Sequence, residues 1–83
     1  MRAECQLFII PACPQCELAE YELMPLIEQG LLVELIDISV DQYLRDRYAS
    51  ATPLLRRVDT GAELAWPFEA DQVVAFLGST EGR

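Results

Sequence analysis

Short apolar runs alternate along the chain with longer segments in which apolar residues recur at helical spacing. Residues 6–10 and 31–38 are apolar at most positions, which is typical of strands buried on both faces of a sheet. Between them, residues 14–29 carry an apolar stripe and a polar side rich in glutamate. This arrangement predicts a right-handed crossover between two parallel strands, with the first strand central in the sheet.

The helix predicted over residues 14–29 has an expected buried side and an expected interruption. Pro25 lies inside the segment and lacks a backbone N–H, so we expect a kink or break near residues 21–24. Gly30 is a suitable residue to end the helix. The side chains expected to face the core are Ala19, Leu23, Leu26 and Ile27.

A second helix is predicted over residues 40–49. Residues 39–42 have the spacing of a capping box, which opens a helix by satisfying its first N–H groups. Leu44 and Tyr48 are four residues apart, so both should face the sheet.

The last third of the chain predicts a hairpin and a final helix. Strands are expected over residues 54–58 and 63–66, joined by a tight turn at 59–61 in which a glycine supplies the positive φ. The final helix is expected over residues 69–77. Its predicted buried residues are Ala70, Val73, Val74 and Leu77.

The length and apolar content indicate one folded domain. The chain has 83 residues, and 52% of them are hydrophobic, which is typical of a folded rather than a disordered chain. We therefore expect a single domain over residues 1–78 and a flexible tail over residues 79–83.

The charge balance excludes several function classes. Six basic residues, all arginine, stand against 14 acidic residues, which gives a formal net charge of −8. Nucleic acids and anionic membranes need a cationic face, so neither is an expected partner. The absence of histidine excludes His-based acid–base pairs, Cys–His proteases and most zinc enzymes. No stretch resembles a membrane span or a secretion signal, so a cytoplasmic protein is expected.

The stretch with the clearest chemistry is Cys13-Pro14-Gln15-Cys16, at the junction of the first strand and the first helix. One helical turn brings both sulfurs to the same helix end, close enough to form a disulfide. Pro14 falls at the first helical position and Cys13 at the N-cap, where free N–H groups and the helix dipole favour a thiolate. Cys16 should be more buried and protonated, so Cys13 suits the nucleophile and Cys16 the resolving thiol.

The third cysteine, Cys5, lies outside this pair. An odd number of cysteines does not fit a disulfide-stapled secreted domain and favours a pair that cycles between thiols and disulfide. The alternatives are a structural or inactive pair, and a metal or iron–sulfur centre within one chain or shared between two. A metal site needs about four ligands, so no metal is expected. Cys5 is expected to be a small core or edge residue.

The order of elements and two short motifs resemble a known family. A Cys-Pro-x-Cys after the first strand and Thr52-Pro53 before the third resemble the thioredoxin fold in its glutaredoxin-sized form. More narrowly, the chain resembles the small glutaredoxin-like family of bacterial domains. The resemblance implies an α/β fold of three layers, α/β/α, ordered β-α-β-α-β-β-α, with a four-stranded mixed sheet. The matching residues are 7–16, 36–38, 44–48, 52–55 and 66–68.

The resemblance also implies a mechanism and a substrate site. The peptide bond before Pro53 would be cis and would hold the backbone of Thr52 beside Cys13, ready to pair with an extended substrate segment. Cys13 and Cys16 would exchange electrons with a protein or small-molecule disulfide, and an external thiol reductant would then reset the pair. The alternative to this oxidoreductase function is a non-catalytic protein-binding module. In either case a monomer is expected. The residues implied to bind the substrate are Pro14, Gln15, Thr52 and Pro53.

Departures from the family bear on glutathione. Well-studied glutaredoxins carry an aromatic residue at the Gln15 position and a basic residue near the first cysteine, and this chain has neither. Residues 66–69 stand where the family has a Gly-Gly turn and an acidic residue that hold glutathione. Glutathione is itself anionic. No cofactor is therefore expected, and glutathione is disfavoured as the direct substrate of this acidic chain.

The remaining arginines and aromatic residues are expected to be structural. Arg56 and Arg57 are adjacent on a strand and point to opposite faces, so at most one can line the site, and both are expected to be solvated. The aromatic residues expected to pack against the core are Trp66 and Phe68, beneath the last helix, and Tyr21, Tyr43 and Tyr48.

Overall fold

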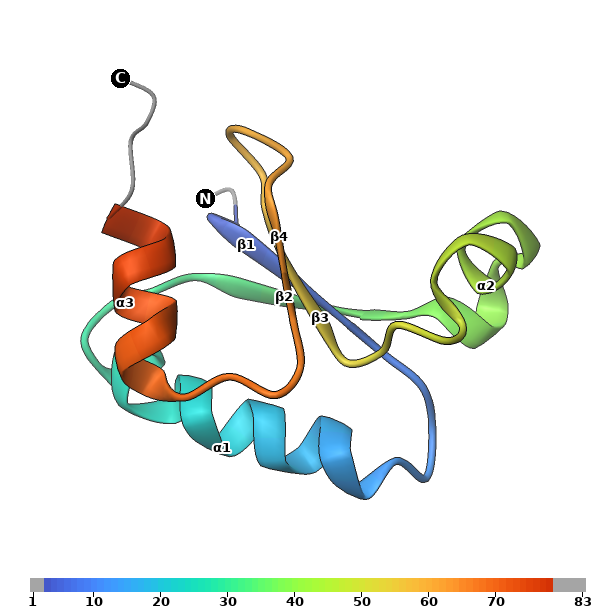
Figure 1. The fold of residues 1–83 in the computed structure, drawn as a ribbon, viewed down its shortest axis with the longest axis horizontal. Helices are drawn as coiled ribbons and strands as arrows, with labels where there is room; N and C mark the ends of the chain where they lie inside the picture. The colour runs from blue at the N-terminus through green and yellow to red at the C-terminus, as the bar shows by residue number, and fades with distance from the viewer. Residues whose placement is uncertain (1–2, 79–83) are drawn as a thin grey trace.

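A four-stranded mixed sheet forms the centre of the computed structural model, which describes residues 3–78 (Figure 1). The elements follow the predicted order, with one additional 3-10 helix, η1, before α2. Their bounds are β1 Cys5–Ile9, α1 Pro14–Glu28, β2 Val33–Asp37, η1 Ile38–Val40, α2 Gln42–Tyr48, β3 Leu54–Arg57, β4 Glu63–Ala65 and α3 Ala70–Gly78.

The strands lie in the order β2-β1-β3-β4, so β1 is central as predicted. β1 and β2 run parallel, with Leu7 opposite Leu35, and α1 makes the crossover between them. β3 runs antiparallel to β1, and β4 antiparallel to β3. The predicted α/β class with a four-stranded mixed sheet is confirmed.

Helices cover both faces of the sheet, and each face has its own apolar core (Figure 1). On one face, Leu7 from β1 packs with Leu23 from α1 and Val73 from α3. On the other face, Phe8 packs with Tyr48 from α2, and their ring centroids are 4.6 Å apart. Each fully buried side chain of this kind contributes about 1.5–3 kcal/mol of stability. The two cores fix the helices on the sheet and thereby position the start of α1.

α1 is continuous from Pro14 to Glu28, so of the kink or break expected near residues 21–24, the break does not occur. The carbonyl that Pro25 leaves without a partner belongs to Tyr21, and both residues lie on the exposed side of the helix. Water can therefore satisfy this carbonyl, and the helix does not have to end there. It ends at the predicted place, where Gly30 has φ 114°.

The buried sides of α1 and α3 are narrower than predicted. Ala19 and Leu23 are buried as expected, but Ile27 is 39% exposed. On α3, Val73 is buried as expected, whereas Val74 is 52% exposed. Each misplaced residue directly follows a core-packed one, and a single helical step of about 100° turns its side chain away from the core.

Two separate caps replace the capping box predicted at residues 39–42. Asp37 accepts a hydrogen bond from the Ser39 N–H at 2.9 Å and caps η1. Asp41 accepts one from the Leu44 N–H at 3.1 Å and caps α2, which therefore begins later than predicted. An aspartate at the N-cap is as favourable as a serine, so the second carboxylate sets where α2 begins.

Only one of the three tyrosines expected to pack does so. Tyr48 is buried, and Leu44 packs against the same cluster, as predicted. Tyr21 and Tyr43 are 76% and 68% exposed, so the prediction is wrong for both.

Across residues 3–78, none of the helices combines the length and the apolar character that crossing a membrane requires. The tail predicted over residues 79–83 lies outside the described residues.

Candidate functional site

Cys13 occupies the N-cap of α1, as predicted, with φ −118° and ψ 103°. Its sulfur accepts a hydrogen bond from the backbone N–H of Cys16 at 3.1 Å. Its carbonyl accepts one from the Glu17 N–H at 3.2 Å, and Pro14 begins the helix. The sulfur therefore lies at the positive end of a 15-residue helix, where a negative charge is stabilised.

The turn that delivers Cys13 to this position contains a strained residue. Ala12 has φ 54°, in the left-handed region that few residues other than glycine adopt. A non-glycine residue in this region costs about 1–2 kcal/mol, and such residues cluster at functional sites. The turn joins the end of β1 to the extended backbone of Cys13, whose sulfur then faces the first turn of α1.

Cys16 lies one turn deeper than Cys13 and is more buried, with 3% of its surface exposed against 8%. Both residues are free thiols. The pKa of the Cys16 thiol is raised to about 11, mainly by burial and next by its hydrogen bond to the Cys13 sulfur, while a hydrogen bond with the Ile10 backbone acts in the opposite direction. Cys16 is therefore protonated at neutral pH.

The peptide bond between Thr52 and Pro53 is cis, and Pro53 is buried. The Pro53 carbonyl accepts a hydrogen bond from the Trp66 N–H at 3.2 Å. Thr52, by contrast, makes no hydrogen bond with any residue in the described range 3–78. The Trp66–Pro67 bond is also cis, which the sequence does not predict because a proline alone does not distinguish the two forms.

A cleft of about 740 Å³ brings part of the predicted site together. Gln15, from the cysteine motif, and Thr52 both line it, whereas Pro14 is exposed outside the lining. Trp66 is partly exposed there, and its ring meets buried Phe68 edge-on with centroids 5.1 Å apart. The residues that line the cleft are Gln15, Ser50, Ala51, Thr52, Ala65, Trp66 and Pro67.

The sequence profile of the Glutaredoxin-like domain (DUF836) matches residues 4–78. The chain belongs to this glutaredoxin-like family. The matched range contains both cysteines of the motif and every residue of the cleft. No curated protein gives a significant match.

Two solved structures of one protein from X. campestris share the fold of this glutaredoxin-like chain. The X-ray structure of Northeast Structural Genomics target protein XcR50 has a TM-score of 0.82 and 27% identity, over 93% of this chain and 99% of that one. The solution structure of XcR50 has a TM-score of 0.74 and 27% identity, over 94% of this chain and 96% of that one. The thioredoxin-like fold predicted from the sequence is thereby confirmed.

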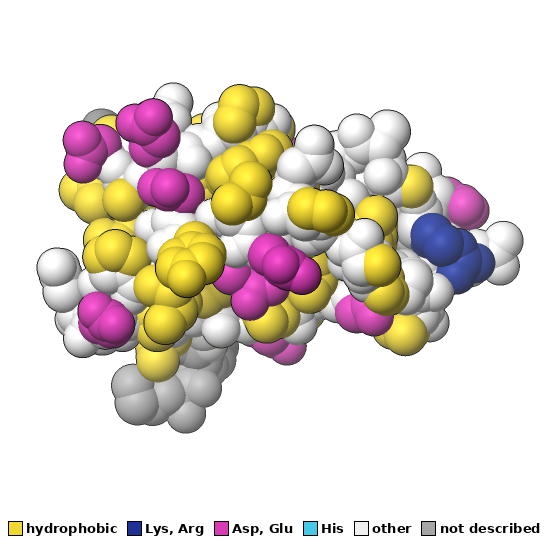
Figure 2. Space-filling view, turned by 90° about the horizontal axis from the view of Figure 1, so that it is seen from below, with side chains coloured by type: hydrophobic (Ala, Val, Ile, Leu, Met, Phe, Trp, Pro, Cys, Tyr) yellow, Lys and Arg dark blue, Asp and Glu magenta, His cyan; other side chains and the backbone are white. Residues whose placement is uncertain are grey.

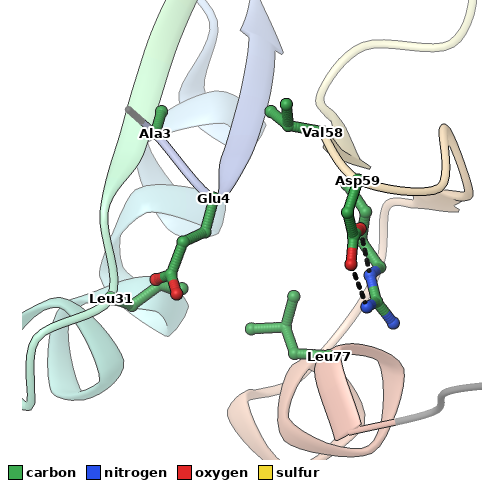
Figure 3. Close-up of a pocket in the computed structure, with 7 residues that line it drawn as sticks. Ala3, Glu4, Leu31, Val58, Asp59 and Leu77 are labelled. Carbon is green, nitrogen blue, oxygen red and sulfur yellow. Dashed lines mark hydrogen bonds and ion pairs between the residues drawn. The ribbon is translucent and has the colours of Figure 1, made fainter. Parts of the chain in front are cut away.

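A second cavity, of about 640 Å³, opens at the opposite end of β1 (Figure 3). It is lined by Ala3, Glu4, Leu31, Arg57, Val58, Asp59 and Leu77. Arg57 is buried, so the prediction of a solvated side chain is wrong. Its guanidinium pairs with Asp59 at 2.7 Å and donates to the Phe76 carbonyl at 3.0 Å. The alternation of β3 turns Arg57 toward α3, and these partners satisfy the buried charge.

Cys5 lies at this second end of the sheet and is fully buried in the core, as predicted. The length of β1, roughly 13 Å, separates it from the cysteine pair. Among the described residues, no three His, Cys, Asp or Glu side chains are grouped so that they could hold a metal ion.

Proposed function

We propose that this glutaredoxin-like chain is a thiol–disulfide oxidoreductase that uses Cys13 as the nucleophile and Cys16 as the resolving thiol. The observation that supports this most is the hydrogen bond of 3.1 Å from the Cys16 N–H to the Cys13 sulfur at the helix N-cap. A thiolate is the reactive form in disulfide exchange, and backbone N–H groups at a helix start favour that form.

The reaction proceeds in two exchanges. The Cys13 thiolate attacks one sulfur of the substrate disulfide, a bond forms between them, and the other substrate sulfur leaves as a thiolate that takes up a proton. Cys16 then loses its proton and attacks Cys13, which releases the second substrate sulfur as a thiol. The substrate gains two electrons and two protons, and the Cys13–Cys16 pair becomes a disulfide. An external thiol reduces the pair again.

The environment of Cys16 suits this order of events. In the reduced protein its pKa is raised to about 11, mainly by burial, and two smaller causes, the hydrogen bond to Cys13 and the charge on Cys13, depend on the Cys13 sulfur. When Cys13 enters a mixed disulfide, its sulfur is neutral, so both contributions fall away and the pKa of Cys16 decreases. Burial, the main cause of the raised pKa, remains, so the change in Cys13 lowers the pKa of Cys16 only in part.

Thr52 supports a substrate-binding role for the cleft. Its unpaired backbone groups offer an extended segment one donor and one acceptor, as an added strand would require. Gln15 borders the same cleft, and the buried cis Pro53 follows Thr52 directly. Pro14 is exposed beside the nucleophile, where an incoming substrate can contact it.

The Cys16→Ser variant tests the proposal because it stops the reaction after the first exchange. Incubation with a peptide disulfide should yield a stable adduct of one peptide on Cys13, detected by intact mass and by cleavage with dithiothreitol. The matched control is Cys16→Ser with Cys13→Ser, which keeps only Cys5 and should form no adduct. If the double variant forms the adduct equally, or if Cys16→Ser forms none, the proposed roles are wrong.

A further inference from the structure

The part of the cleft beside the cysteine motif that the structure describes contains no charged side chain. The seven described residues that line it are Gln15, Ser50, Ala51, Thr52, Ala65, Trp66 and Pro67. The chain around it is strongly acidic, with a net charge of −8. Figure 2 shows the α1 side of the molecule, where acidic side chains are spread over the face and basic ones gather at one end. The described lining of the cleft is thus uncharged, in a chain whose net charge is negative.

None of the arginines within residues 3–78 lines this cleft. Arg45 and Arg47 lie on α2, which ends shortly before Ser50. Arg56 lies in β3, with its side chain near Gly61 of the hairpin turn. The other three have partners within the fold: the Ser39 carbonyl for Arg45, the Tyr48 hydroxyl for Arg47 and the Asp59 carboxylate for Arg57. With no lysine or histidine in the chain, the described part of the cleft offers an anion no cationic partner.

The surface of the cleft instead fits an uncharged extended segment. The open N–H and carbonyl of Thr52 can pair with a backbone, and this pairing does not depend on the side chains of the segment. The partly exposed ring of Trp66 offers an apolar contact for a residue beside the substrate cysteine. A small anionic disulfide would use neither feature well and would approach against the net charge.

We propose that this site selects disulfides carried by extended polypeptide segments with uncharged or basic residues around the cysteine, and that it discriminates against anionic disulfides such as glutathione disulfide. The inference rests on the proposed function, because it assigns the substrate class of the same cysteine pair. Each half of glutathione disulfide carries more carboxylates than ammonium groups, and no cation stands among the described lining residues to compensate for that charge.

The test compares kcat/KM for three probes on the reduced wild-type protein: a peptide disulfide with uncharged flanks, cystamine, which is small and cationic, and glutathione disulfide. The peptide should exceed glutathione disulfide by about tenfold or more, and cystamine should also exceed it, because one unscreened charge contact is worth about this factor. Added salt should narrow the gap between cystamine and glutathione disulfide. Equal or faster turnover of glutathione disulfide overturns the inference and leaves the proposed function intact.

A charge variant gives the second arm of the test. Ser50→Arg places a cation in the cleft lining and should raise kcat/KM for glutathione disulfide by about tenfold. Gln29→Arg makes the same change in net charge at the far end of α1 and should leave that value within about twofold of the wild type. Equal gains in both variants would show that net charge alone decides, which overturns the assignment to the cleft. If the protein turns over none of the three probes, both this inference and the proposed function are wrong.

Discussion

The two ends of β1 carry cavities of similar size and opposite character. The cleft at the cysteine motif has a volume of about 740 Å³ and no charged residue in its described lining, whereas the cavity at the other end has about 640 Å³ and contains Glu4, Arg57 and Asp59. In the charged cavity, Arg57 already pairs with Asp59 and with a backbone carbonyl. In the cleft, Thr52 has no partner among the described residues. The two cavities therefore differ in whether the groups that line them are paired, and hardly in volume.

The thiols at the two ends make the same point. The pKa values of Cys5 and Cys16 are both raised to about 11, and burial is the main cause for each. Only Cys16 lies one turn from a second sulfur at a helix start. A buried thiol alone is inert, and it can take part in thiol–disulfide exchange only when a disulfide lies within its reach.

The largest difference is expected between cysteines at the two ends. Cys13→Ser removes the proposed nucleophile and should lower kcat/KM for disulfide reduction by about 10³-fold or more. Cys5→Ala changes the core at the other end of β1 and should leave kcat/KM within about twofold. The measurement is reduction of a peptide disulfide by each purified variant. Similar losses in both variants would contradict the separation of the two ends.

The next effect concerns stability at the charged end. Arg57→Met removes hydrogen bonds to Asp59 and to the Phe76 carbonyl, so the free energy of unfolding should fall by about 2–3 kcal/mol. Arg56→Met, on the opposite face of the same strand, is the matched control and should change it by about 0.5 kcal/mol. Urea denaturation measures both values. Equal losses would mean that the Arg57 contacts contribute nothing specific.

Alkaline pH should weaken the fold through Cys5. Burial is the main cause that raises the pKa of Cys5 from 9.0 to about 11, Glu4 adds to it, and Arg57 opposes it. The folded state holds this proton more tightly, so the stabilisation is complete below about pH 9 and is lost as pH rises toward 11. Between these values the wild type should lose about 1–3 kcal/mol more than Cys5→Ala.

Urea denaturation at several pH values gives the required comparison. Cys16 titrates in the same window but is present in both proteins, so it cancels in the difference. Parallel pH profiles for the wild type and Cys5→Ala would rule out a contribution from Cys5.

The smallest expected effect is a change in stability from substitutions in two turns, one near each end of β1. Ala12 has φ 54° and Gly61 has φ 77°, so each backbone favours glycine. Ala12→Gly should therefore leave stability unchanged or raise it by about 1 kcal/mol, whereas Gly61→Ala should lower it by about 1 kcal/mol. A methyl group on Gly61 would lie 3.7 Å from the Arg56 side chain, an ordinary contact, so the loss reflects the backbone. Thermal unfolding measures the stability of both variants. A large loss of stability in Ala12→Gly would show that the backbone of Ala12 is not strained.

The features predicted from the sequence are those that depend on neighbouring residues. Pro14 and Cys13 set the start of α1 through local backbone rules, so the N-cap and the depth of Cys16 could both be predicted. The order of elements and the parallel pair of strands follow from the apolar pattern in the same way. Asp41 marks the limit of this reasoning, because Ser39 and Asp41, two residues apart, can both cap a helix and only the folded chain shows which one caps α2.

The features that were not predicted depend on contacts between distant segments. Arg57 was expected in solvent, but Asp59 and the carbonyl of Phe76 meet its charge inside the fold. Ala65 and Pro67 line the cleft because the β3–β4 hairpin brings them opposite Gln15, and nothing in their local sequence marks them. A pattern of apolar residues specifies which elements form, but not which uncharged side chains meet at their ends.

The most direct test of the central claim is iodoacetamide labelling of the three cysteines in the reduced wild-type protein, resolved by peptide mass at several pH values. Cys13 should be labelled first and already at neutral pH, since its sulfur accepts a backbone N–H at the start of α1. Cys5 and Cys16 should react only as the pH approaches about 11. If Cys13 is labelled no faster than the other two at neutral pH, the helix start does not activate it and the account is contradicted.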